Sequence, residues 1–136
     1  REWSRVRLPG RRRVAPSLPE GLREVTYKLF LDDLRAPPDQ TWVVVRTVRA
    51  AIEYVETYGL PLEMSLDHDL GYGERDAPAF LHWLTDYDMD HGYLGLEKIG
   101  FNVHSANPAG RKNLEGFWNS YLMHLHVNEG RVRIIR

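Results

Sequence analysis

Three short apolar segments of the chain each end in acidic or histidine residues, and this pattern restricts the fold more than any other feature. The segments 29–31, 64–66 and 101–103 run into Asp32-Asp33, Asp67-His68-Asp69 and His104-Ser105-Ala106-Asn107-Pro108. Short apolar runs that lead into polar residues are typical of buried strands that deliver side chains to a pocket. We therefore expect three strand ends to meet and to form one site.

Predicted strands and helices alternate along the chain. Strands are expected over residues 25–31, 42–45, 62–66, 100–103 and 131–135, and helices over 48–58, over 77–90 and from residue 108 onward. Such alternation predicts a parallel sheet with helices on both faces, as in a flavodoxin-like three-layer α/β/α sandwich with a mainly parallel sheet. Ligands of such sheets bind at the carboxyl ends of the strands, where all three polar clusters lie.

The length of 136 residues suits one α/β domain, over residues 25–136, preceded by a basic arm over residues 1–24. Six arginines stand against one acidic residue in the first 13 positions of the arm. Arginine clusters bind RNA, DNA or acidic protein surfaces, which makes candidate partner-binding residues of Arg5, Arg7, Arg11, Arg12 and Arg13. The alternative is that the arm is a solvated tail.

Composition excludes several classes of protein. No apolar run approaches the roughly 18 residues of a membrane span. The absence of cysteine excludes disulfides, thiol catalysis and zinc–thiolate sites. The formal net charge of -1 gives no general attraction to nucleic acid or to an anionic membrane. We therefore expect a cytoplasmic protein that does not bind membranes.

Four carboxylates near one sheet edge would repel one another unless they were protonated or shared a divalent cation. These are Asp32, Asp33, Asp67 and Asp69, and their all-oxygen character favours a hard ion, so we expect Mg2+. Because side chains alternate along a strand, Asp32 and Asp33 cannot both point the same way within it. One is therefore expected to bind the ion and the other to support it. For any single aspartate, the alternative is a helix or loop cap.

Two histidines are candidates for proton transfer. The imidazoles of His68 and His104 titrate near neutral pH, which suits transfer to and from a phosphoester oxygen. Each can instead be a hydrogen-bonded structural histidine. Ser105 and Asn107 precede a predicted helix whose free N–H groups can bind a phosphate, and Arg35 can add a positive charge. The alternative for Asn107 is simple capping of the helix.

The three motifs together resemble the cyclic-phosphate processing receiver domain family. They read Leu29-Phe30-Leu31-Asp32-Asp33-Leu34-Arg35 with Pro37, then Ser65-Leu66-Asp67-His68-Asp69-Leu70-Gly71, then His104-Ser105-Ala106-Asn107-Pro108. The resemblance covers about residues 27–125 and leaves the arm outside. It implies a receiver-like α/β fold and an activity on cyclic phosphates, in RNA repair or in conflict between phage and host.

The family is related to response-regulator receivers, and this relation implies a rival function. Asp67 would then be the phosphoacceptor, Asp32 and Asp33 the acidic metal pair, and Ser105 the switch hydroxyl. Receivers also carry a lysine after their fifth strand, and no lysine follows residues 131–135. This departure counts against phosphorelay.

Two functions remain open from the sequence. The first is a metal-dependent phosphoesterase that opens a cyclic phosphate on a nucleotide or an RNA end, with carboxylates holding the ion and histidines moving protons. The second is a non-enzymatic, receiver-like interaction protein, for example one encoded by a phage. It would bind host machinery such as RNA polymerase through its surface and its basic arm.

Overall fold

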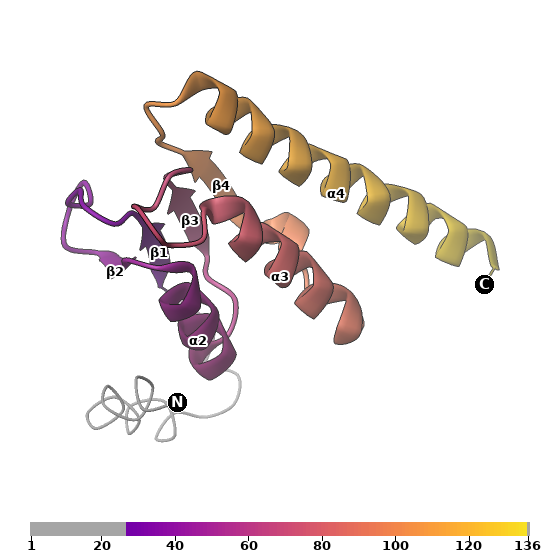
Figure 1. Cartoon of the computed structure of the whole chain (residues 1–136). Coiled ribbons are helices and arrows are strands. Elements are labelled where there is room, and N and C mark those ends of the chain that lie inside the picture. Colours follow the sequence, from indigo (N-terminus) through magenta and orange to yellow (C-terminus); the bar gives the residue numbers. More distant parts are fainter. Residues whose placement is uncertain (1–26, 136) are drawn as a thin grey trace, which may run out of the picture.

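A four-stranded parallel sheet, in the order β2-β1-β3-β4, forms one layer of the protein (Figure 1). The computed structural model describes residues 27–135, with side chains up to residue 127, so the predicted arm lies outside the described residues. The strands are β1 (Lys28–Leu31), β2 (Trp42–Val45), β3 (Glu63–Leu66) and β4 (Gly100–Val103). The predicted bounds of β2 and β4 are confirmed.

All four strands end at the same level. Leu31 of β1 pairs with Val45 and Leu66, and Leu66 pairs in turn with Val103. The residues that follow β1, β3 and β4 therefore share one edge of the sheet, as expected from the three polar strand ends. This register, set by parallel pairing, brings together residues that are far apart in sequence.

Three α-helices follow the strands, and a short 3-10 helix precedes β4. They are α2 (Val48–Tyr58), α3 (Ala77–Asp90), η3 (Leu96–Lys98) and α4 (Pro108–Ile135). Helix α2 begins as predicted, because the hydroxyl of Thr47 accepts a hydrogen bond from Ala50 N–H at 3.0 Å. Gly59 ends this helix with a φ of 93°.

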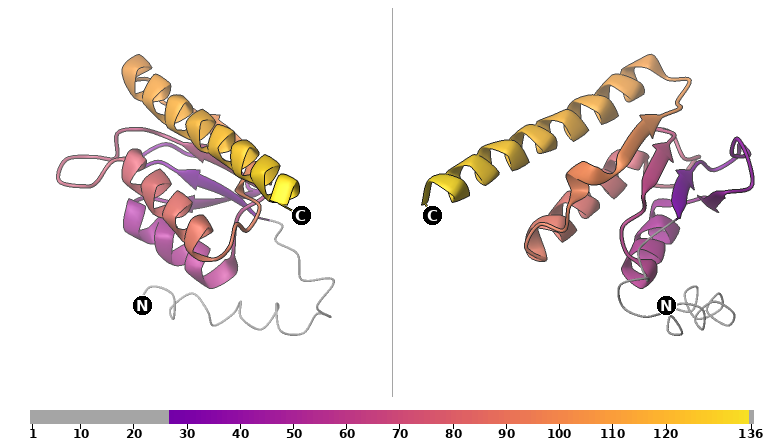
Figure 2. Two further views of the ribbon diagram at one scale, coloured as in Figure 1. Left: turned by 90° about the vertical axis from the view of Figure 1, so that its right-hand side faces the viewer. Right: turned by 180° about the vertical axis from the view of Figure 1, so that it is seen from behind.

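The three helices cover one face of the sheet. Strand residues that alternate along this face, such as Leu29 and Met64, form one apolar core with helical residues such as Val55, Leu84 and Leu114. The two views in Figure 2 agree with this arrangement. The receiver-like α/β fold is therefore confirmed.

The described residues form only two of the three expected layers. A receiver-like fold would place a helix between β1 and β2, on the opposite face. Residues 32–41 form a loop there instead, in which Pro37 and Pro38 interrupt any helix. The uncovered face carries alternate strand residues, including Phe30 and Trp42, whose ring centroids lie 6.0 Å apart.

The prediction of a fifth strand over residues 131–135 was wrong, because helix α4 continues through them. Alternating apolar and basic residues suggested a strand, but such local preference is weak. Extending an existing helix adds one hydrogen bond for each residue, whereas a new strand needs a turn first. Strand β4 is therefore an edge strand within residues 27–135. None of the helices described is long and apolar enough to cross a bilayer.

A buried hydrogen bond joins α3 to α4. The hydroxyl of Tyr121 donates to Oδ2 of Asp88 at 2.5 Å, and Oδ1 of Asp88 accepts from Leu94 N–H at 2.6 Å. Burial raises the pKa of Tyr121, and the bond to Asp88 raises it further, so the hydroxyl remains a donor. The fully buried carboxylate of Asp88 depends on these donors.

We expect Tyr121→Phe to lower the free energy of unfolding by about 1–3 kcal/mol, because it leaves one oxygen of Asp88 without its donor. Urea denaturation followed by circular dichroism measures the change. Tyr72→Phe is the matched control, since Tyr72 is fully exposed and loses only a solvated hydroxyl. Equal stability of the two variants would contradict the assigned importance of the bond.

Candidate functional site

Three carboxylates from two strand ends lie together at the edge of the sheet. Backbone N–H groups of Asp32 and Asp67 donate to Val45 and Leu31 carbonyls at 3.1 and 2.9 Å, which fixes both residues directly after β1 and β3. One oxygen from each of Asp32, Asp33 and Asp67 lies within 4.8 Å of the others. Asp32 is 1% exposed and Asp67 is 8% exposed, so two of these acids are buried.

Asp32 is the best stabilised of the three carboxylates. Its Oδ1 accepts hydrogen bonds from the backbone N–H groups of Leu34 and Arg35, at 2.8 and 2.9 Å. Its Oδ2 accepts one from Nε2 of His104 at 2.9 Å. Burial alone would raise the pKa of Asp32, but these donors outweigh burial and hold the pKa below its usual value. Asp32 is therefore a permanent anion at neutral pH.

The pKa of Asp67 is shifted in the opposite direction from that of Asp32. Burial raises its pKa, and the nearby charge of Asp32 raises it further. The positive charge of Arg35 and a hydrogen bond from the Ser105 hydroxyl both lower the pKa, but they do not cancel the two larger effects. The anionic form of Asp67 is thus destabilised by its surroundings, and a cation between the two carboxylates would relieve this repulsion.

The imidazole of His104 is held on both sides. Its Nδ1 is hydrogen-bonded to Oγ of Ser65 at 2.7 Å, and Nε2 is bonded to Asp32. The ring also stacks on Phe30, with centroids 4.4 Å apart and planes 3° from parallel. Because both ring nitrogens contact protein groups, His104 orients Asp32 in this arrangement.

Ser65 and Asn102 were missed as site residues from the sequence. The amide of Asn102 donates to Oγ of Ser65 at 3.1 Å, which completes a chain of hydrogen bonds to His104 and Asp32. The sequence held only a partial signal, because Ser65 is a polar residue between Met64 and Leu66 of the predicted strand, whereas its pairing in register with Asn102 is known only from the sheet. Two polar residues paired on one face of neighbouring strands indicate a shared hydrogen-bond network.

Asp69 does not join the first three carboxylates. It forms a second group with His68 and Asp76, whose ligand atoms also lie within 4.8 Å of one another. Oδ1 of Asp69 is hydrogen-bonded to Nδ1 of His68 at 2.7 Å, and this bond is the main reason that the pKa of Asp69 lies below its usual value. Of the four aspartates predicted for one metal site, the structure therefore brings three together.

His68 has one unused ring nitrogen. Its Nε2 is buried and has no hydrogen-bond partner among the described residues. The ring packs against Gly110 in the first turns of α4, where a Cβ atom would lie only 2.5 Å from Cγ of His68. Close packing of this histidine therefore requires glycine at position 110.

Asn107 joins the start of α4 to the second acidic group. Its Oδ1 accepts from Gly110 N–H at 3.1 Å, so the predicted cap is confirmed. Its Nδ2 donates to Oδ2 of Asp69 at 3.2 Å, and its backbone N–H donates to Oγ of Ser105 at 3.0 Å. The residues predicted to bind phosphate thus line the turn between the two groups of acids.

Arg35 extends over the rim of the carboxylates. Its guanidinium donates from Nη1 to the carbonyl of His104 at 2.6 Å, and Nε lies 3.9 Å from Oδ2 of Asp32. Its side chain remains 47% exposed, so it can also contact a ligand. The five arginines predicted to bind a partner, Arg5, Arg7, Arg11, Arg12 and Arg13, lie outside the described residues.

We expect Gly110→Ala to lower the free energy of unfolding by about 1–3 kcal/mol, because the added methyl group would overlap His68. Gly116→Ala is the matched control on the same helix, since a Cβ there has no neighbour within 4 Å. The control should be more stable than the parent by about 0.5–1 kcal/mol. Thermal and urea denaturation measure both changes, and a stabilised Gly110→Ala protein would refute the close contact.

Comparison with known proteins identifies one family. The sequence model of one protein family, the cyclic-phosphate processing receiver domain, matches residues 27–120. No curated protein and no solved structure matches the chain. The matched region spans all four strands and all the site residues described above. The chain therefore belongs to the cyclic-phosphate processing receiver domain family.

Proposed function

We propose that the domain is a metal-dependent phosphoesterase that opens a cyclic phosphate on a nucleotide or an RNA end. The observation that supports this function best is the meeting of Asp32, Asp33 and Asp67, two of them buried, at one edge of the sheet. Carboxylates that lie this close together with little access to water repel one another, which favours a cation between them.

The donor set fits Mg2+. Three carboxylates supply only oxygen atoms. Burial is the main reason that the pKa of Asp67 is raised, and repulsion by Asp32 adds to it, as expected when two acids share a site without a cation. Asp33 is the most accessible of the three and leaves room for water or substrate oxygen. A bound Mg2+ would stabilise the negative charge that develops on the phosphate group. Asp69 belongs to the histidine group in this proposal and does not hold the ion.

The phosphate group would lie over the turn that starts α4. Ser105 and Asn107 line this turn, and Arg35 reaches the same rim from the loop after β1. The guanidinium and the helix N-terminus both favour an anion. They would orient the cyclic phosphate with one ring oxygen toward His68.

Ring opening needs one proton to leave a water molecule and one to reach the departing oxygen. Water attacks phosphorus, one ring P–O bond breaks, and the products are a phosphomonoester and a neighbouring hydroxyl. His68 is the best-placed proton carrier, because Asp69 holds its Nδ1 and its Nε2 is unused. In this role protonated Nε2 would give its proton to the departing oxygen, while the attacking water on the opposite side of phosphorus would lose its proton to solvent.

The buried position of Nε2 adds one requirement. Substrate can reach this atom only if groups packed around the ring move, and Gly71 and Gly73, with φ values of 101° and 84°, lie in the loop that follows His68. His104 takes a different role from the one expected from the sequence, since its nitrogens are bonded to Ser65 and Asp32. His104 is a positioning residue, because its hydrogen bond favours the ionised form of Asp32 and fixes the orientation of that carboxylate.

We expect Mg2+ to raise the melting temperature of the parent protein and to have no such effect on Asp67→Asn. Without the ion, Asp67→Asn should melt higher than the parent, because it removes a buried charge beside Asp32. Differential scanning fluorimetry with and without Mg2+ measures both effects. Asp39→Asn is the matched control, since Asp39 is exposed and outside the cluster. An unchanged melting temperature in the parent would argue against the ion site.

We expect His68→Gln to lower the turnover of a 2',3'-cyclic nucleotide by about 100-fold or more, because the proton carrier is lost. Release of the phosphomonoester, followed by chromatography, measures the rate. His82→Gln is the control, since His82 is exposed on α3 and outside both groups of acids. Equal rates in the parent and in His68→Gln would remove His68 from the mechanism.

A non-enzymatic interaction protein is the second candidate function. Among residues 27–135, one face of the sheet has no covering helix and the outer edge of β4 is unpaired, and these surfaces favour an interaction protein because a partner can occupy them. A partner such as RNA polymerase would then contact this side and the basic arm. A screen of cyclic phosphates with and without Mg2+ separates the two functions, because only the enzyme would release a phosphomonoester.

A further inference from the structure

The outer edge of β4 is unpaired within the described part of the chain. Gly100 and His104 donate their N–H groups to Leu62 and Leu66, at 2.9 and 3.0 Å, on the β3 side. Because successive residues of a strand point their N–H and C=O groups in opposite directions, those of Phe101 and Val103 point away from β3. This edge therefore offers two residues, with both donors and acceptors, to another strand.

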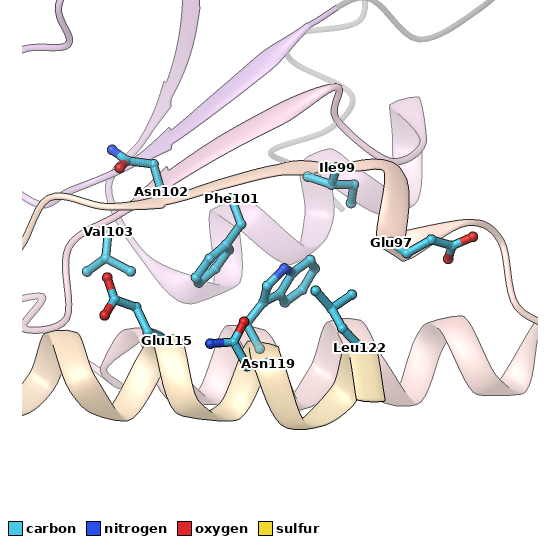
Figure 3. A pocket seen from close by; sticks show the side chains of 9 residues that line it. Glu97, Ile99, Phe101, Asn102, Val103, Glu115, Asn119 and Leu122 are labelled. Atoms are coloured by element: carbon cyan, nitrogen blue, oxygen red, sulfur yellow. The ribbon is translucent and has the colours of Figure 1, made fainter. Parts of the chain in front are cut away.

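A groove runs beside this edge, between β4 and α4 (Figure 3). Its volume is about 440 Å3. Ile99 and Phe101 line it from the strand side, and Trp118 and Leu122 line it from the helix. The rings of Phe101 and Trp118 stack with centroids 4.7 Å apart, which makes a flat apolar floor. An added strand would place every second side chain on this floor.

The rim of the groove is acidic. Glu97 and Glu115 lie at its border, and no lysine or arginine is among its lining residues. Nη1 of Arg111 lies 3.6 Å from Oε2 of Glu115, so this ion pair compensates only part of the negative charge of the rim. The apolar floor therefore fits a strand with apolar side chains on the face that enters the groove, and the nearby negative charge favours a basic segment over an acidic one.

We propose that this strand is residues 5–8 of the chain itself, pairing in parallel with β4. The segment reads Arg5-Val6-Arg7-Leu8, with alternating basic and apolar residues. Val6 and Leu8 would enter the groove, while Arg5 and Arg7 would lie on the opposite face of the sheet, away from α4. The pairing would supply the fifth strand of the receiver-like sheet from the N-terminal side of the chain.

The connection back to β1 is long enough and has the correct handedness. The new strand would lie three strand spacings from β1, about 14 Å, and residues 9–26 can span about 60 Å when extended. The connections from β2 to β3 and from β3 to β4 move toward β4 across the helical face. A right-handed connection that moves the other way must cross the opposite face. That face is the one on which Phe30 and Trp42 lie without a covering helix.

Hydrogen exchange of the full chain tests this proposal. The amides of Phe101 and Val103 should exchange at least ten-fold more slowly in the parent than in a Val6→Asp/Leu8→Asp variant. Ser17→Asp is the matched control within the arm, and it should keep the protection. The amides of Gly100 and His104, which are bonded to β3, should be unchanged in all proteins and show that the sheet remains folded. Equal exchange of Phe101 and Val103 in parent and variant would overturn the proposal.

Cross-linking identifies the source of the strand. Because the chain contains no cysteine, Leu8→Cys and Asn119→Cys can be introduced together and oxidised without competing thiols. Asn119 lines the groove, whereas Asn113 lies on α4 outside it and provides the control pair. We expect an intramolecular cross-link for the Asn119 pair at low micromolar protein, and little for the Asn113 pair. A cross-linked dimer instead, or protection that rises with protein concentration, would overturn the assignment to the same chain.

Discussion

The carboxylates of Asp32 and Asp67 lie close together where water has little access. Their mutual repulsion must be offset by hydrogen-bond donors, by protonation or by a cation, and the site depends on this balance. Two backbone donors and His104 favour the ionised form of Asp32, whereas Asp67 has fewer donors and faces the charge of Asp32. The parallel register is what imposes this proximity, since it ends β1 and β3 at one level. The fold thus places two carboxylates where they repel each other, and a bound cation would reduce this repulsion.

Much of this arrangement could be predicted from local sequence signals. The strand ends were visible as apolar runs that stop at acids, and the rule that parallel strands end at one edge brings Asp32 and Asp67 together. The capping role of Asn107 followed from its place before Pro108. The grouping of Asp69 could not be predicted, because the chain turns after β3 and the contact to His68 depends on the path of that turn.

Features that depend on distant parts of the chain were harder to predict. Ser65 and Asn102 act together only because β3 and β4 are neighbours, which no local pattern reveals. The strand expected at residues 131–135 was overridden by continuation of α4, since helix growth is cooperative. The prolines after β1 did indicate a loop, but its consequence, a sheet face that no helix of the described residues covers, is evident only once the topology is known.

The pairing of Asn107 with Pro108 also bears on how the protein ages chemically. Asparagine side chains deamidate when the backbone nitrogen of the next residue attacks the side-chain carbonyl, and proline has no N–H with which to do so. Deamidation at this position would set a new carboxylate against Asp69, which now accepts a hydrogen bond from the amide of Asn107. The proline that starts α4 therefore also protects this amide from slow covalent damage over the lifetime of the protein.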